Sequence, residues 1–185
     1  MEKTLTRDEL LLSLLKKARD PFTTMEQKRD VKRIMMESTT MRGMNHLFLV
    51  QCYFQDHPLF HVTRKEALNQ AYLAFRENNQ GAYYYLYLLL KDEDQVRARN
   101  YLRLACTSGN PYAFLEMGKL QYRGELFPLN RKEAYQSFSM AAKCGLPDGY
   151  FYMLLIASED HDVDLEKKIM EEARKAHIEL PGVVE

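Results

Sequence analysis

Apolar residues recur every three or four positions along most of this chain, and polar residues occupy the positions between them. A period of about 3.6 residues predicts amphipathic α-helices. No alternation of apolar and polar residues typical of a β-strand extends over a useful length, so we predict an all-α protein. Three of the apolar stripes are Leu10, Leu11, Leu14 and Leu15; Leu68, Ala71, Tyr72 and Phe75; and Tyr135, Phe138, Ala141 and Ala142.

Start and stop signals divide this pattern into separate helices. A Thr or Asn followed three residues later by Glu or Gln predicts a capping box, in which each side chain accepts a hydrogen bond from an orphan amide of the first turn. A residue that tolerates positive φ, followed by Pro, predicts the end of one helix and the start of the next. The start signals are Thr6–Glu9, Thr24–Gln27, Thr63–Glu66 and Asn130–Glu133, and the stop signals are Asp20–Pro21, Gly109–Pro111 and Gly145–Pro147.

Part of the sequence is repeated. Residues 57–67 and 124–134 share Leu-Phe and then Arg-Lys-Glu-Ala at the same spacing, which predicts stacked helical hairpins. Small residues recur at Ala67, Ala98 and Ala134, in steps of 31 and 36, as expected where adjacent helices approach closely. The loops inside the hairpins alternate between long and short. The unit that repeats best is therefore a pair of hairpins, as from Ala67 to Ala134, which we call the two-hairpin repeat. We expect the Leu-Phe pair to anchor each long loop on the core.

The segment from Ala113 to Gly145 resembles a Sel1-like repeat, a relative of the tetratricopeptide repeat. The residues that carry the resemblance are Ala113, Met117-Gly118, Gly124, Glu133-Ala134 and Ala141-Ala142 with Gly145. The chain departs from the family pattern at Gln121, where Tyr is usual, and it contains no Trp. Weaker matches extend the resemblance over residues 44–157.

The resemblance implies an α-α superhelix, a right-handed solenoid of antiparallel helical hairpins. We predict a single domain, residues 1–185, with repeats at 44–78, 79–109, 110–145 and 146–178 and a tail at 179–185. Residues 1–43 are predicted to form either a degenerate repeat or a cap.

The geometry of the tetratricopeptide family implies that the first helix of each hairpin lines a concave groove. On a Tyr-rich helix, we expect Tyr83 and Tyr87 to pack in the core, whereas Tyr84 and Tyr85 allow two interpretations, core packing or contact with a partner. The candidate partner-binding residues are Asn45, Gln55, Tyr84, Tyr85, Glu116, Lys119, Tyr122, Arg123 and Tyr152.

Composition and charge narrow the classes of function. The chain has 26 basic and 26 acidic residues and no net charge, which argues against a general nucleic-acid binder or a binder of anionic membranes. The first residues lack the basic and apolar regions of a secretion signal, so we expect a cytoplasmic protein. Cys52, Cys106 and Cys144 are far apart and form no Cys-x-x-Cys motif, which favours buried apolar residues in a reducing compartment.

Recognisable catalytic motifs are missing from the sequence, which has no nucleophile elbow, phosphate-binding glycine loop or His-Glu-x-x-His. His57 and His61 are four residues apart but fall in a predicted loop, so we predict no metal site, and we predict no catalytic or cofactor-binding residue. The main hypothesis is a non-enzymatic adaptor or scaffold, of bacterial type, that binds a protein or peptide partner in its groove. The alternative is a regulatory sensor for a small peptide or metabolite. A homodimer is possible, and an enzyme is the third hypothesis.

Overall fold

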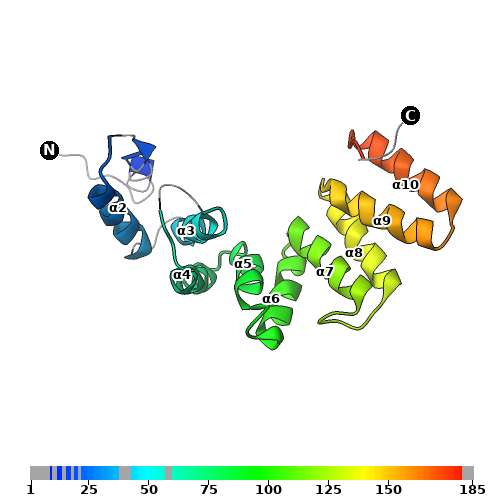
Figure 1. The fold of residues 1–185 in the computed structure, drawn as a ribbon, viewed down its shortest axis with the longest axis horizontal. Coiled ribbons are helices and arrows are strands. Elements are labelled where there is room, and N and C mark those ends of the chain that lie inside the picture. Colours follow the sequence, from blue (N-terminus) through cyan, green and yellow to red (C-terminus); the bar gives the residue numbers. More distant parts are fainter. Residues whose placement is uncertain are drawn as a thin grey trace. The chain divides into compact units, whose positions relative to one another are not determined.

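The computed structural model describes residues 9, 12–13, 16–17, 19–20, 22–37, 43–56 and 60–180. These residues form helices joined by turns and loops and contain no strand, which confirms the predicted all-α class (Figure 1). The four leucines of the first stripe (Leu10, Leu11, Leu14 and Leu15) and Thr6 of the first predicted capping box lie outside the described residues. The helices are α2 (Met25–Glu37), α3 (Met44–Phe54), α4 (Arg64–Arg76), α5 (Ala82–Leu90), α6 (Gln95–Thr107), α7 (Pro111–Arg123), α8 (Arg131–Lys143), α9 (Pro147–Glu159) and α10 (Val163–Lys175).

The chain divides into two compact units, Met1–Asp94 and Gln95–Glu185. In the N-terminal unit each of the helices α2 to α5 packs on the next one in sequence, and in the C-terminal unit α6 to α10 do the same. The division falls inside the predicted repeat 79–109, between its two helices α5 and α6. The single-domain organisation and the right-handed superhelix stay predictions.

Two helix starts carry the predicted capping box in full. The Thr63 hydroxyl accepts from the Glu66 N–H while the Glu66 carboxylate accepts from the Thr63 N–H, and Thr24 and Gln27 make the same reciprocal pair. The box predicted at Asn130–Glu133 is only half formed. Asn130 accepts from the Glu133 N–H, but the Glu133 carboxylate accepts from the Gln121 side chain, and the Asn130 N–H donates to the Gln121 carbonyl instead.

The second helices end in one recurring turn. A residue with positive φ follows the helix, and the next N–H donates back to the carbonyl of a buried Ala five residues earlier, which is the Schellman motif. The predicted stops at Gly109 and Gly145 are confirmed, since φ is 79° and 87° there. The positive-φ residues are Asn78, Gly109, Gly145 and His177, and the accepting residues are Ala74, Ala105, Ala141 and Ala173.

Small residues let α7 and α9 approach α8 closely, as predicted. A Cβ on Gly149 would lie 2.5 Å from the Ala142 nitrogen and 2.6 Å from the Phe138 carbonyl oxygen, so the backbones of α8 and α9 are in contact there. A Cβ on Gly118 would lie 2.6 Å from the Phe138 ring. Phe138 is fully buried, so its ring fills the space that Gly118 leaves open.

The phenylalanine of each repeated Leu-Phe pair anchors its long loop, as predicted. Phe60 is buried and meets Phe48 edge to face at 6.1 Å between ring centroids. Phe127 is buried on α6, where the guanidinium groups of Arg99 and Arg103 lie 5.5 and 5.4 Å from its ring centroid. These cations contact the ring face favourably and hold the loop to the preceding second helix.

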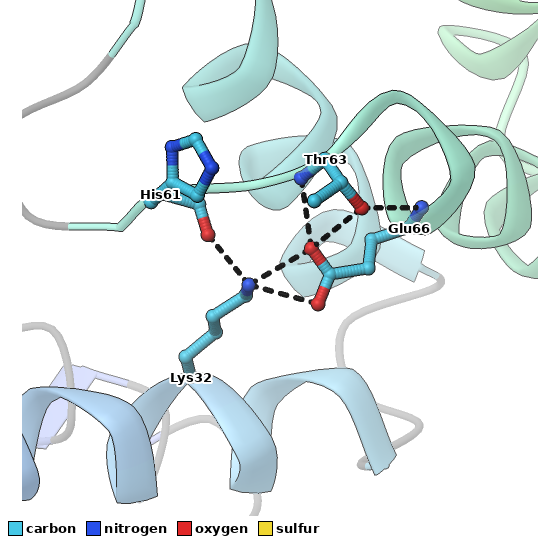
Figure 2. A network of polar contacts seen from close by, with 4 residues as sticks. All are labelled: Lys32, His61, Thr63 and Glu66. Carbon is cyan, nitrogen blue, oxygen red and sulfur yellow. Dashed lines mark hydrogen bonds and ion pairs between the residues drawn. The ribbon is translucent and has the colours of Figure 1, made fainter.

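Lys32 attaches α2 to the first turn of α4. Its ammonium group donates to the His61 carbonyl at 2.6 Å and to both carboxylate oxygens of Glu66 at 2.9 and 3.0 Å. Figure 2 shows how these contacts join the two segments. Burial would raise the pKa of the Glu66 carboxyl, but hydrogen bonds from Thr63 and Lys32 outweigh burial and hold that pKa below its ordinary value of 4.5.

The helix α2 has the register of a second helix. Alignment on the two-hairpin repeat places Val31 and Met35 at the positions of Ala98 and Leu102 in α6, and all four side chains are buried. The same alignment matches Phe60 with Phe127. This correspondence favours a degenerate repeat over an unrelated cap for the N-terminal segment.

Gly149→Ala and Gly145→Ala should destabilise the C-terminal unit by different amounts. Gly145 needs positive φ but a Cβ there would meet nothing within 4 Å, so the cost is about 1 kcal/mol of backbone strain. Gly149→Ala drives a Cβ into backbone, which we expect to cost about 3 kcal/mol. Urea unfolding followed by circular dichroism measures both, and equal losses would contradict the assigned contacts.

Lys32→Met should weaken the attachment of α2 and flatten its acid dependence. The lowered pKa of Glu66 means that this carboxylate stabilises the fold above pH 4.5, and that the stabilisation is lost as pH falls through the lowered value. We expect α2 to lose about 1–2 kcal/mol of local stability at pH 7, and less towards pH 3. Amide hydrogen exchange in α2 measures this loss. The control is Arg33→Met, which removes an exposed pair with Asp30 and should change little. Parallel pH curves for wild type and Lys32→Met would refute the role of Lys32.

Candidate interaction surface

In the C-terminal unit, α7 and α9 present a mixed aromatic and charged surface. The Lys119 ammonium lies 5.5 Å from the centroid of the Tyr152 ring and 3.2 Å from the Glu116 carboxylate. Tyr152 in turn stacks on Phe138 at 4.7 Å, with 13° between the ring planes. Three of the predicted residues, Glu116, Lys119 and Tyr152, are therefore brought together on one half-buried platform.

A second cluster closes the end of this surface. The Tyr122 hydroxyl donates to a Glu159 carboxylate oxygen at 2.5 Å, and the Arg131 guanidinium donates to Glu159 at 2.8 Å and to Asp160 at 2.9 Å. The hydrogen bond to Glu159, together with burial, raises the pKa of Tyr122. Tyr122, predicted to face a partner, thus uses its hydroxyl to tie α7 to α9.

The N-terminal unit has an aromatic surface on its own first helices, α3 and α5. The rings of Phe54 and Tyr85 lie 5.6 Å apart, and Tyr85 packs against the small core around Ala82. Tyr84 lies 6.0 Å from Tyr87, which is buried as predicted. Tyr83 is half-buried, with its ring 6.0 Å from that of Phe75. Phe54 remains 41% exposed, so this surface offers apolar area to solvent.

The two surfaces are related by the two-hairpin repeat. Tyr85 and Tyr152 occupy equivalent positions in it, and each contacts the preceding first helix of its own unit, through Phe54 and Lys119 respectively. The same tyrosine position therefore faces an aromatic ring in one unit and a cation in the other.

The first residues of α4 and α8 also correspond under this repeat. Arg64 pairs with Glu93 at 2.6 Å, and the equivalent Arg131 pairs with the equivalent Asp160 at 2.9 Å. Arg64 also donates to the Leu89 carbonyl. The repeated Arg therefore clamps each second helix to the turn that follows the next first helix.

The remaining predicted residues have other places. Asn45 is fully buried and its amide donates to the Met35 carbonyl at 2.7 Å, so its assignment to an open surface was wrong and it serves α2–α3 packing. Gln55 follows the last residue of α3 and is exposed beside Phe54. Arg123 is exposed and lies 3.9 Å from Glu125. These last two border the surfaces without bridging helices.

Sequence reasoning missed Phe54, Phe151 and Glu159. Phe151 is 47% exposed and meets Tyr152 edge to face at 5.4 Å. Phe54 and Phe151 could have been found from the sequence pattern. Each is a large apolar residue at a position where the helical period predicts a polar one, and each stands next to a candidate residue, Gln55 or Tyr152.

The described residues contain no group of three or more His, Cys, Asp or Glu side chains arranged to hold a metal ion. Among them, no helix is long and apolar enough to cross a membrane. Cys52 is buried and Cys106 is half-buried, and burial raises the pKa of their thiols to about 11 and about 12. Cys144 is exposed, which corrects its prediction as a buried residue, because it follows α8 in the turn.

Together these features define an all-helical repeat protein. We call the surfaces on α3 and α5 and on α7 and α9 its first-helix surfaces, because these are the first helices of the hairpins. No protein-family model and no curated protein matches the sequence. The structure is similar to the crystal structure of a Sel1 repeat protein from Oxalobacter formigenes, with a TM-score of 0.64 and 15% identity over 86% of this chain. The chain spans 63% of the length of that protein. The likeness shows a Sel1-like all-α repeat fold, as the sequence resemblance predicted.

Glu159→Gln should lower the pKa of Tyr122. An ionised phenolate beside the Glu159 carboxylate is disfavoured, so removing that negative charge makes ionisation easier. Titration of tyrosine ring carbons by NMR above pH 9 measures the change, with Tyr122→Phe identifying the resonance. An unchanged titration in Glu159→Gln would show that the hydrogen bond does not persist in solution.

Proposed function

We propose that this chain is a non-enzymatic interaction module that binds a partner peptide or helix on its first-helix surfaces. The observation that carries the proposal is the pairing of exposed aromatic rings with the repeat-related tyrosines. Phe54 adjoins Tyr85 in the N-terminal unit, and Phe151 adjoins Tyr152 in the C-terminal unit. Aromatic side chains supply large contact areas at low entropic cost and dominate many interfaces.

The packing beneath these rings favours a preformed surface. Tyr152 is stacked on the buried Phe138, and Tyr85 is packed on the core of its unit, so neither ring has to be ordered when a partner arrives. A surface already ordered before binding loses less entropy on association. The charges of Glu116 and Lys119 beside Tyr152 would select the register of a partner more than its affinity.

The fold similarity supports the same class of function at a coarser level. Stacked helical hairpins expose extended surfaces made from successive first helices, and such surfaces suit segments of another protein. A catalytic function has no comparable support, because the titratable side chains of these surfaces are engaged with one another in Glu116–Lys119 and in the cluster around Arg131.

Phe54→Ala with Tyr85→Ala, and separately Phe151→Ala with Tyr152→Ala, should abolish partner capture in a pull-down from cells of the source organism. We expect at least a tenfold loss of affinity for the purified partner, about 1.4 kcal/mol or more, measured by calorimetry. The matched control is Leu129→Ala, which truncates a large side chain that is 66% exposed on the long loop of the second unit.

The controls also define what would count against the proposal. Each variant must keep the circular dichroism spectrum of the wild type. A folded double variant that binds the purified partner as tightly as wild type would reject its surface. If Leu129→Ala weakened binding as much as the double variants, the partner would sit on the loop instead.

A further inference from the structure

We propose that the outer face of α10 is a second docking surface, separate from the first-helix surfaces, and that it receives an amphipathic partner helix carrying two carboxylates. The outer face of α10 is defined by Lys167, Met170, Arg174 and Ile178, with Leu180 at its edge. It lines an open depression of about 670 Å³.

The floor of this depression is apolar. Met170 is half-buried on the helix, while Ile178 and Leu180 follow the turn that ends α10 and pack against the core of the C-terminal unit. Ile178 and Leu180 are therefore held in place by the core on one side and border the depression on the other. A fixed apolar floor of this kind suits another apolar side chain.

The repeat register indicates what kind of element fits there. The accepting residues Ala141 and Ala173 end α8 and α10 in the same Schellman turn, so the two helices can be aligned on them. That alignment places Met170 at the position of Phe138, and Ile178 at the position of Leu146. On α8 this face is covered by α9, and Phe138 and Leu146 pack in that core. The outer face of α10 is thus the position at which α8 receives a helix.

Two residues of α10 differ in chemistry from their equivalents on α8. Where α8 has Ala142, in contact with the backbone of α9, α10 has Arg174. Where α8 has Tyr135, α10 has Lys167. A docked helix must therefore lie farther out than α9 does, and it meets a cation on each side of Met170.

Neither cation is held in a close ion pair with the described residues, and Arg174 interacts with Glu171 only at longer range. Among the described residues, Glu171 is paired with Lys175 at 2.8 Å, whereas no carboxylate lies within 4.0 Å of Lys167 or Arg174. They are seven residues apart on α10, which places them about two turns apart on the same side. Glu171 and Glu179 also line the depression, so its formal charges balance and the two cations act on a partner only locally.

The geometry of α9 on α8 predicts the partner's spacing. Gly149 of α9 lies on Ala142, and Met153, four residues later, is buried in the core with Phe138. Because the short turn between them makes α8 and α9 antiparallel, the next turn of α9 approaches Tyr135. A helix on α10 would therefore carry an acid opposite Arg174, an apolar residue four positions later opposite Met170, and a second acid three or four positions beyond.

The test uses a fluorescent, acetylated alanine- and glutamine-based helical peptide containing Glu-x-x-x-Leu-x-x-x-Glu, and a twin with Lys in place of both Glu. Fluorescence anisotropy with the full chain at low salt should show binding of the acidic peptide and at least about tenfold weaker binding of the basic one. Lys167→Glu with Arg174→Glu should reverse this preference. Lys132→Glu with Lys143→Glu, exposed on α8, makes the same change of net charge elsewhere and should leave it unchanged.

Three results would overturn the proposal. The first is no binding of the acidic peptide, or equal binding of both peptides. The second is a reversal produced equally by the control pair, which would indicate general attraction by net charge. The third is binding that appears only in a variant ending at Leu180, or self-association in sedimentation that Arg174→Glu removes, because the occupant would then be this chain's own C-terminus or a second copy. Phe54→Ala with Tyr85→Ala should not affect peptide binding, which separates this surface from the first-helix surfaces.

Discussion

The chain reversal after the second helices α4, α6, α8 and α10 is the constraint on which the packing of consecutive hairpins depends. One residue enters positive φ, and the following N–H returns to the carbonyl of a fully buried Ala, at Ala74, Ala105, Ala141 and Ala173 alike. Because the acceptor is both small and buried, the turn satisfies a helix end and lets the next helix lie close to the one just finished. A larger side chain at that Ala would separate the helices, and loss of positive φ would misdirect the chain.

A second layer of organisation has a period of two hairpins. The anchoring rings Phe60 and Phe127 recur with this period, and so do the clamping pairs of Arg64 and Arg131. This alternation follows from the lengths of the loops. Only a long loop can reach back to the preceding second helix, and such a loop needs a buried ring to hold it in place. The repeated Leu-Phe and Arg-Lys-Glu-Ala segments therefore encode scaffold, with Arg as clamp and Ala as close packing. The Glu accepts at the helix start in the first copy, at Glu66, but accepts from Gln121 in the second, at Glu133.

The helices, their caps and the alternating loops were predictable because they depend on residues close together in sequence. Thr63 and Glu66 are three residues apart, and Gly145 acts through its own φ. What failed depended on distant partners. Asn45 is buried because Met35 offers it a carbonyl, and Glu133 leaves its capping box because Gln121 competes for it. The division between Asp94 and Gln95 was not among the predictions, because it depends on long-range packing that periodicity does not report.

The repeat register also separates scaffold from recognition. Positions that keep their residue type, such as Ala141 and Ala173, form the same backbone turn wherever they occur, so they can carry little specificity. Other positions are equivalent in the repeat but hold different residue types, and these positions contact different neighbours. Ala142 touches the backbone of α9, but its counterpart Arg174 faces an open depression. A buried contact has there become a charge beside an apolar floor, so a helix packed on α10 cannot repeat the close backbone approach that α9 makes to α8.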